Sequence, residues 1–261
     1  TVIVASTSSG GSRNAVSPAS AKAVSIPVAV KVLPPSFARS DPTNISRFLR
    51  EARSAARLKH QNVVGVLNVG QEKNLHYIVM DFVDGQSLQK RIQAEGQLPV
   101  AQAVEIILQM CDALAYASKN GIVHRDIKPD NILVGTDGLA RLADLGLAKH
   151  VADDTGLTTA GMAMGTPQYM APEQAHDTQS ADHRSDLYSL GCTLYRILAG
   201  AAPYQGTTSY AVICAHETEP VPDVRQANPE IPAALAAVVR KMMAKDPADR
   251  YQTAEKVAED L

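Results

Sequence analysis

The sequence of 261 residues lacks several features that would place it in a specialised class. Its three cysteines, Cys111, Cys192 and Cys214, lie far apart with no His or Cys at metal-ligand spacing. This pattern indicates neither a disulfide framework nor a zinc site, and it favours a reducing compartment. No run of 18 apolar residues exists, so we expect no membrane contact from this segment itself. The net charge of -2 excludes a broad basic surface around which nucleic acid could wrap.

The sequence also lacks an initiator Met and a charged leader, since it begins TVIVASTSSGG. We therefore expect a piece of a longer protein rather than the product of a signal peptidase. Hydrophobic residues make up 45% of the chain and charged residues 20%, which is typical of a folded domain and argues against long disorder, collagen or coiled coil. The length fits one domain with two unequal lobes.

Charge is distributed unevenly along the chain. Residues 1–60 carry nine Lys and Arg against two Asp and Glu, whereas the remaining residues carry 16 against 25. This asymmetry suggests an anionic ligand, with or without a metal, held between a basic and an acidic part. Mutual attraction of the two parts, or surface chance, is the alternative that composition alone favours.

The hydrophobic periodicity predicts strands first and helices later. Four runs in the first 83 residues read as strands, with one helix of period 3.6 after Asp41-Pro42. The predicted strands are Thr1–Ala5, Val28–Leu33, Val63–Gly70 and Leu75–Phe82. After Asp84-Gly85 the chain becomes mostly helical, with a short strand at Ala140–Ala143. The predicted helices there are Val100–Lys119, Leu187–Ala199 and Leu235–Ala244.

Separated segments of the chain carry the residue types that perform chemistry. Lys31 stands in the predicted strand VAVKVL, and Glu51 stands in the predicted helix. Further along come IVHRDIKPDNILV at residues 122–134, Asp144-Leu145-Gly146, Gly165-Thr166-Pro167 and Ala171-Pro172-Glu173. Each alone could be an ordinary turn or ion pair, but together and in this order they form a strong signal.

In this order of motifs the sequence resembles the eukaryotic-like serine/threonine protein kinases, particularly their bacterial branch. The resemblance runs from about Ser9 to Leu261. It implies an α+β fold of the protein-kinase type, with ATP in a cleft between two lobes. The small lobe, mainly antiparallel β with one key helix, is expected at residues 1–83, and the larger, mainly α-helical lobe at 84–261. ATP and Mg²⁺ are the implied cofactors.

The resemblance implies a role for each motif residue. Lys31 should hold the α- and β-phosphates of ATP, and Glu51 should pair with that ammonium. Asp126 should accept or orient the proton of the substrate hydroxyl, and Lys128 should steady the transferring phosphate. The implied Mg²⁺ ligands are Asn131 and Asp144, because a hard cation suits few protein oxygens plus phosphate oxygens.

Three residues of the larger lobe are expected to support the site. Asp186, in SDLYSLG, resembles the buried Asp that braces the catalytic-loop backbone of these kinases. Glu173 and Arg250 resemble their buried ion pair. Tyr188 stands where many relatives carry Trp, consistent with the absence of Trp from the whole chain.

The nucleotide site is where the sequence departs from the family. Counted back from Lys31, the pattern Gly-x-Gly-x-x-Gly falls on Ser9, Gly11 and Asn14, so only the middle Gly survives, with Gly10 beside it. Ser and Asn are the next best substitutes, so we expect weakened rather than abolished ATP affinity. The full set of expected ATP contacts is Ser9, Gly10, Gly11, Asn14, Val16, Ala29, Lys31, Met80, Asp81, Val83 and Leu133. Ordinary core packing is the alternative for the apolar members.

Substrate class and regulation can also be read from the resemblance. Lys128, two residues after Asp126, resembles the serine/threonine kinases, and Thr166 in GTPQYMAPE supports this. The Thr-rich segment at residues 147–170 predicts autophosphorylation at Thr158 or Thr159, with Arg125 as the partner of the phosphate. A loop that is only flexible is the alternative.

Our interpretation is therefore a protein serine/threonine kinase domain whose partners are ATP and Ser/Thr-bearing proteins. A homodimer could form during autophosphorylation. We expect a cytoplasmic domain, with any membrane anchor of the full-length protein outside this segment. The main alternative is a pseudokinase scaffold, favoured by the degenerate Gly-rich loop. A kinase of small molecules is disfavoured by GTPQYMAPE, which resembles a protein-substrate platform.

Overall fold

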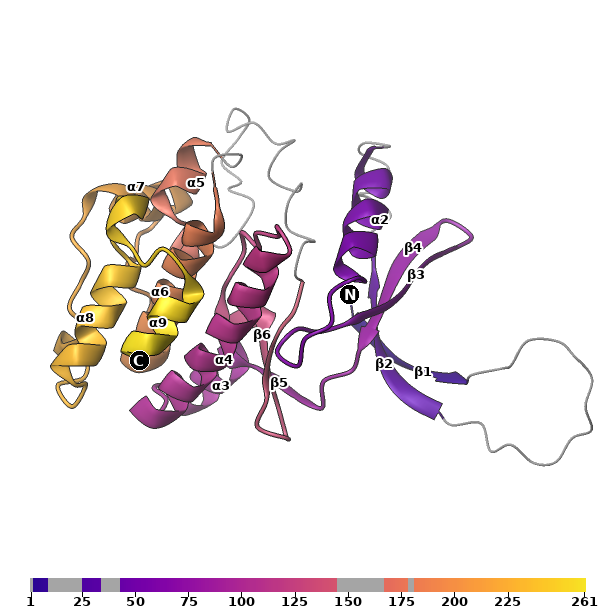
Figure 1. Ribbon diagram of the computed structural model, residues 1–261, viewed down its shortest axis with the longest axis horizontal. Helices are drawn as coiled ribbons and strands as arrows, with labels where there is room; N and C mark the ends of the chain where they lie inside the picture. The colour runs from indigo at the N-terminus through magenta and orange to yellow at the C-terminus, as the bar shows by residue number, and fades with distance from the viewer. Residues whose placement is uncertain (1, 9–24, 34–42, 145–166, 178–180) are drawn as a thin grey trace, which may run out of the picture. The chain divides into compact units, whose positions relative to one another are not determined.

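The computed structural model describes residues 2–8, 25–33, 43–144, 167–177 and 181–261. The chain divides into two compact units (Figure 1). Unit 1 contains residues 1–59 and 64–82, and unit 2 contains residues 60–63 and 83–261. The four residues 60–63 thus leave unit 1 in the middle of its sequence and fold with unit 2.

Unit 1 is built on a four-stranded antiparallel sheet of order β1-β2-β4-β3. Its strands are β1 Val2–Ser8, β2 Ser25–Val32, β3 Val66–Glu72 and β4 Leu75–Asp81. The tight turn between β3 and β4 includes Lys73, whose φ of 53° lies in the left-handed region. All neighbouring strands run antiparallel, as predicted for the small lobe.

The pairing of β2 with β4 decides which side chains share a face of this sheet. Ala29 lies opposite Met80, and Lys31 lies opposite Ile78. Because side chains alternate along a strand, these four residues point to one face, whereas Val28 points to the other. Ile78 and Val28 are both buried, so each face carries apolar core.

Helix α2, Thr43–Ala55, is the one helix of unit 1 among the described residues. Ala52 and Ala55 are buried, and the helix packs against β3. Their spacing of three residues places both on one side of the helix, as an amphipathic surface helix requires. The predicted helix after Asp41-Pro42 is confirmed from Thr43 onward.

Unit 2 is mainly helical, with its core on α4 and α6. Its α-helices are α3 Leu88–Glu95, α4 Val100–Lys119, α5 Pro172–His176, α6 His183–Ala199, α7 Ser209–Thr218, α8 Ala233–Met242 and α9 Ala254–Asp260. The described part of unit 2 also contains the 3-10 turns η1 Pro129–Asn131, η2 Pro167–Tyr169, η3 Val224–Gln226 and η4 Pro247–Asp249. Helix α6 is buried along almost its whole length, and α4, α8 and η2 pack against it.

Helix α4 has the bounds that its apolar stripe predicted. It is also long and apolar enough to cross a membrane by length and composition alone. The core helix of a folded domain meets the same criterion, and α4 packs against α6, α9 and β7, with Ile107 fully buried. Its charged residues Glu105 and Asp112 are exposed on the opposite side. We therefore describe α4 as the central helix of unit 2.

A three-stranded antiparallel sheet of order β5-β6-β7 completes unit 2. Its strands are β5 Gly85–Ser87, β6 Ile132–Gly135 and β7 Ala140–Leu142. Val63 forms an isolated parallel bridge with Leu142 on β7. The predicted strand Val63–Gly70 was therefore wrong at its start, because Val63 pairs within unit 2 and β3 begins only at Val66.

Candidate functional site

One buried carboxylate, that of Asp186, fixes the backbone of the loop His124–Asn131. Asp186, near the start of α6, is 2% exposed and accepts hydrogen bonds from two backbone N–H groups of this loop. The donors are His124 N, at 2.8 Å, and Arg125 N, at 2.7 Å. Burial raises the pKa of Asp186, while the neighbouring His124 and the two N–H donors oppose that rise. The predicted bracing role of Asp186 is confirmed.

His124 links the loop to the strand that follows it. Its Nδ1 accepts the backbone N–H of Asp126 at 3.2 Å, which places the ring proton on Nε2. That nitrogen lies 2.9 Å from the carbonyl oxygen of Ala143 and donates to it. The imidazole is fully buried. Asp126 and Asp144, which are far apart in the sequence, are thereby tied through one side chain and one peptide group.

The carboxylate of Asp126 is contacted by two side chains of its own loop, Lys128 and Asn131. Lys128 Nζ contacts both of its oxygens, at 3.0 Å for Oδ1 and 2.7 Å for Oδ2. Asn131 Nδ2 donates to Oδ2 at 3.0 Å and to the backbone oxygen of Asp126 at 2.8 Å. The Asp126 side chain is still 34% exposed, so it can meet a second molecule. An oriented carboxylate beside an ammonium can accept a proton next to a negatively charged group.

The chemistry of Asn131 and Asp144 fits a hard cation. Asn131 is 8% exposed and uses Nδ2 for both of its bonds to Asp126, so its Oδ1 is the atom that could ligate a metal. Ala143 N donates to the backbone oxygen of Asn131 at 2.8 Å, which brings the start of the Asp-Leu-Gly motif beside Asn131. No group of three or more His, Cys, Asp and Glu residues within the described ranges could hold a metal alone. This suits Mg²⁺, which needs few protein oxygens when phosphate oxygens complete its shell.

Two residues of the site have unusual backbone conformations. Arg125 has a φ of 66° and Asp144 has a φ of 60°. Non-glycine residues seldom adopt this left-handed region, and such strain is maintained where the surroundings over-determine it. Asp186 and His124 provide that constraint at Arg125 through the loop backbone.

The predicted nucleotide contacts come from both units. Ala29, Lys31 and Met80 share one face of the unit 1 sheet, and Asp81 ends β4. The carboxylate of Asp81 accepts Gly65 N at 3.0 Å, while its own N–H donates to the Gly65 carbonyl. Val83 and Leu133 belong to unit 2, where Leu133 lies in the middle of β6.

Several predicted residues fall outside the described structure. Glu51 lies in α2, but its side chain is outside the described part. The Gly-rich segment with Ser9, Gly10, Gly11, Asn14 and Val16 is outside the described residues, as are Thr158, Thr159 and Thr166.

A second, partly buried carboxylate anchors the segment that follows the substrate motif. Arg250 donates to both oxygens of Glu173, each at 2.7 Å, and Ser185 Oγ donates to Oε1 at 2.6 Å. Burial by itself would raise the pKa of Glu173, but these hydrogen bonds outweigh burial and lower it. The predicted Glu173–Arg250 ion pair is confirmed, and Arg250 is 3% exposed.

Gln174 joins this segment to the catalytic loop. Its Nε2 donates to the Arg125 carbonyl at 3.1 Å, and its Oε1 accepts Ala171 N at 3.0 Å. Sequence reasoning assigned no role to Gln174, His124, Asn62 or Gln109, because the partners of these side chains lie far away along the chain. The only sequence signal was the position of His124 and Gln174 inside or beside recognised motifs.

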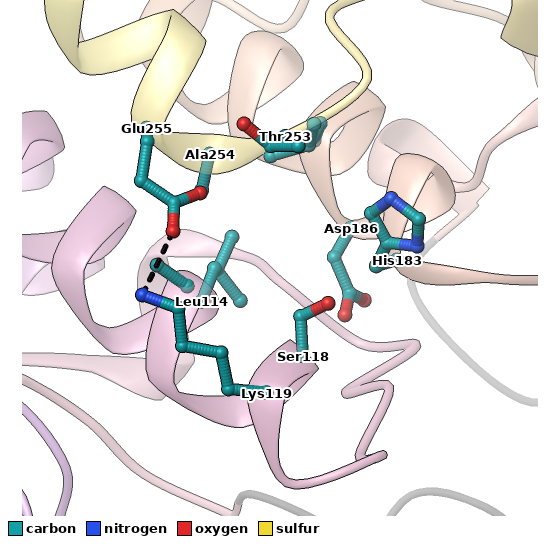
Figure 2. A pocket seen from close by; sticks show the side chains of 10 residues that line it. Leu114, Ser118, Lys119, His183, Asp186, Thr253, Ala254 and Glu255 are labelled. Carbon is teal, nitrogen blue, oxygen red and sulfur yellow. Dashed lines mark ion pairs between the residues drawn. The ribbon is translucent and has the colours of Figure 1, made fainter.

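A cavity of about 210 Å³ lies between α4, α6 and α9 (Figure 2). Figure 2 shows Ser118 and Asp186 on one side of it and the ion pair Lys119–Glu255, 3.0 Å long, on the other. None of the predicted nucleotide or metal residues lines this cavity. It touches the site only through Asp186, whose oxygens are already bonded to the loop.

The chain belongs to the protein kinase family, since the family model described as "Protein kinase domain" matches residues 9–261. "Serine/threonine-protein kinase PknB" of Mycobacterium leprae is 44% identical over 239 residues, covering 90% of this chain and 38% of that protein. "Probable serine/threonine-protein kinase PknB" of Lactococcus lactis is 39% identical over 234 residues, covering 90% and 37%. The chain therefore spans less than two fifths of the length of these relatives.

The fold is also that of a solved kinase structure. The crystal structure of Rad53 1–466 in complex with AMP-PNP matches with a TM-score of 0.73 and 27% identity, covering 89% of this chain and 57% of that one. The predicted α+β protein-kinase fold, and the resemblance to the bacterial serine/threonine kinases, are confirmed.

Proposed function

We propose that this domain transfers the γ-phosphate of ATP to Ser and Thr hydroxyls of proteins. The observation that carries the proposal is the Asp126 carboxylate, held by Asn131 and in contact with the Lys128 ammonium. A hydroxyl that approaches Asp126 can give up its proton there, and Lys128 can turn from Asp126 to the transferring phosphate. Phosphoryl transfer depends on positioning and charge neutralisation, which this arrangement supplies.

The remaining roles follow the family pattern in this proposal. Lys31 binds the α- and β-phosphates, and Glu51 on α2 orients Lys31. Ala29 and Met80 share the Lys31 face of the sheet, so they offer apolar surface to the adenine ring close to that ammonium. Asp81 and Val83 provide backbone hydrogen bonds, and Val16 and Leu133 complete the apolar contacts. Residues 1–83 and 84–261 are the two proposed lobes.

Mg²⁺ is the proposed metal, with Asn131 and Asp144 as its protein ligands. When bound, the cation neutralises phosphate charge during the transfer. The chain's own contribution is to hold the two ligand residues close through the backbone of Ala143, whose N–H bonds to Asn131 and whose carbonyl bonds to His124.

Regulation by phosphorylation at Thr158 or Thr159 is part of the proposal. Arg125 Nε is buried and has no hydrogen-bond partner among the described residues, and its Nη2 makes one long bond of 3.4 Å to the Ala181 carbonyl. A guanidinium with an unused donor is suited to a phosphate on a neighbouring segment. Thr166 is proposed to lie beside Asp126 when the substrate binds.

The pseudokinase alternative depends on the degenerate segment Ser9–Asn14. The curated relatives described above carry names of kinases, and none supports a pseudokinase. We therefore propose that Ser9 and Asn14 weaken ATP binding without preventing it. Anchoring of the full-length protein to a membrane, a cytoplasmic location of this domain and a homodimer during autophosphorylation are further proposals.

Radiolabelled ATP with Mg²⁺ and a generic protein substrate tests the function. We expect label in the protein substrate with the unmodified domain and at least about a hundredfold less with Asp126→Asn. Asp130→Asn, an exposed neighbour in the same loop, is the matched control and should retain activity. Equal background from the unmodified domain and Asp126→Asn contradicts the proposal. Peptide mapping of labelled domain in the same reaction tests Thr158 and Thr159.

A further inference from the structure

Strand β7 leads directly to Asp144 and is the outer strand of its sheet. Its inner edge pairs with β6, which leaves the backbone groups on the outer edge in need of other partners. Two polar residues that belong to no kinase motif discussed above, Asn62 and Gln109, supply these partners. We call these two residues the β7 clasp.

The β7 clasp is a closed set of short hydrogen bonds. Gln109 Oε1 accepts from Ala140 N at 2.8 Å and from Asn62 Nδ2 at 2.9 Å. The same Nδ2 donates to the Ala140 carbonyl at 2.9 Å. The backbone carbonyl of Asn62 then accepts Leu142 N at 2.8 Å. Every outward backbone group from Ala140 N to Leu142 N is thus bonded to one of the two residues.

The burial of Asn62 indicates that the β7 clasp does more than stabilise the fold. Asn62 is fully buried, yet its Oδ1 has no hydrogen-bond partner among the described residues. A buried acceptor without a partner is unfavourable, and an apolar side chain of the same shape would avoid that cost. The amide is explained if its Nδ2 is needed to fix Ala140.

The residues next to Asn62 fasten it to unit 2. The His60 ring stacks on Tyr116 of α4 with centroids 5.0 Å apart, and His60 Nδ1 accepts Asn62 N at 3.2 Å. Val63 pairs with Leu142. Residues 60–63 lie between α2 and β3 along the chain, so the segment that holds β7 is covalently joined to the helix that carries Glu51.

We propose that Asn62 and Gln109 are positioning residues for Asp144. The inference rests on the proposed function, in which Asp144 is a metal ligand. Only Ala143 separates the clasped part of β7 from Asp144, and Ala143 also contacts Asn131 and His124 through its N–H and its carbonyl. A strand released at Ala140 therefore loosens Ala143, the residue whose backbone lies between both proposed metal ligands. Outer partners of this kind control how well a ligand residue serves its metal.

Three substitutions on helix α4 test the proposal. Gln109→Met keeps the size of the side chain and removes the acceptor of Ala140 N and Asn62 Nδ2. Gln109→Glu keeps an oxygen for both donors and loses only the long Nε2 bond of 3.4 Å to the Gly138 carbonyl, so it should behave much more like the unmodified domain than Gln109→Met does. Gln102→Met is the matched control, because Gln102 is exposed on the same helix and its Oε1 accepts from Arg91 on the surface.

Two measurements distinguish positioning from simple stability. Hydrogen–deuterium exchange measures the protection of the Ala140 amide. Of the three variants, only Gln109→Met should exchange this amide faster than the unmodified domain. Electron paramagnetic resonance measures Mn²⁺ binding in the presence of a non-hydrolysable ATP analogue. We expect about threefold to tenfold weaker Mn²⁺ binding in Gln109→Met, somewhat less than the effect of removing a direct partner of a ligand.

The outcomes separate the two proposals. Unchanged Mn²⁺ affinity in Gln109→Met, with or without a lower melting temperature, overturns the positioning role, as does Gln109→Glu behaving like Gln109→Met. If the unmodified domain does not bind Mn²⁺ with the nucleotide analogue, the proposed function fails at its metal site. If it binds both but the substitutions make no difference, only the clasp inference fails.

Discussion

Two carboxylates of unit 2, the buried Asp186 and the partly buried Glu173, satisfy their oxygens in different ways. Asp186 bonds to two backbone N–H groups of the catalytic loop, and burial leaves its pKa raised. Glu173 bonds to the Arg250 guanidinium and to Ser185, and these bonds lower its pKa in spite of burial. One carboxylate organises backbone, and the other is neutralised by a cation that is itself buried.

The difference indicates separate duties. Removing the cation from Glu173 leaves a buried charge, so we expect the fold to suffer most there. Removing the charge from Asp186 leaves two backbone donors short of one acceptor, so we expect the geometry of the loop to suffer most there.

Arg250→Met is expected to cause the largest loss. This substitution leaves the carboxylate of Glu173 without its cation. It also removes the hydrogen bonds that Arg250 donates to the carbonyls of Ala244 and Lys245. We expect the free energy of unfolding to fall by about 3–5 kcal/mol, measured by urea denaturation. Arg184→Met is the matched control, since the Arg184–Asp182 pair is partly exposed and should contribute at most about 1 kcal/mol. Equal losses of unfolding free energy in the two variants would contradict the claim that the Arg250–Glu173 pair stabilises the fold more than the Arg184–Asp182 pair.

Lowering the pH is expected to have the next largest effect, through His216. This imidazole is 1% exposed, has its Nδ1 2.8 Å from the Tyr188 hydroxyl, and packs edge-on against the Tyr204 ring. The Lys245 ammonium donates to the backbone carbonyl of His216 at 2.6 Å. Burial and, to a smaller extent, the charge of Lys245 together lower the pKa of His216 to about 4. The unfolded chain therefore binds the proton more readily, and stability falls as the pH drops from 6.5 towards 4, by up to about 3 kcal/mol.

The acid loss of His216 can be separated from that of the carboxylates. The contribution of Glu173 is lost as the pH falls below 4.5, its ordinary pKa, whereas acidification relieves the burial of Asp186. Unfolding free energies measured between pH 6.5 and 5 should therefore slope in the unmodified domain and be nearly flat in His216→Gln. His176→Gln, at an exposed position, should keep the slope. A slope that survives in His216→Gln would point to another group.

The sequence predicted elements well where their partners did not matter. Helix α4 has the expected bounds because its stripe is continuous and Asn120-Gly121 ends it, and Gly121 has the positive φ of 69° that such an ending needs. Val63 was placed in the wrong strand because its apolar run continues into β3. Only the pairing with Leu142, nearly 80 residues away, separates the two, and periodicity carries no information about such a partner.

The site shows the same division between residues that the sequence could predict and residues that it could not. Asp126, Asn131 and Asp186 stand in motifs with fixed spacing, so their positions could be read directly from the chain. Asn62 and Gln109 could not, because each is a single polar residue whose role appears only when β7 lies between them. Asn62 looks like a turn residue in sequence, and Gln109 looks like a polar position on a helix.

Asp186→Asn is expected to change stability less than Arg250→Met and to change catalysis most among these variants. Its amide keeps one acceptor oxygen, so either His124 N or Arg125 N meets an NH₂ group instead, at a cost of about 1–3 kcal/mol. The displaced loop carries Asp126, and small displacements of a catalytic group cost about a hundredfold in rate, so kcat should fall by that order.

Ser185→Ala provides the matched comparison for Asp186→Asn, because the adjacent Ser185 hydroxyl bonds to Glu173 instead of the loop. It should cost about 1 kcal/mol of stability and leave kcat within about twofold of the unmodified domain. Steady-state kinetics on both variants at a temperature where both are folded makes the contrast measurable. If Ser185→Ala slowed transfer as much as Asp186→Asn, the two carboxylates would act as one connected brace, and the division between an anchor for the fold and an organiser of the loop would be wrong.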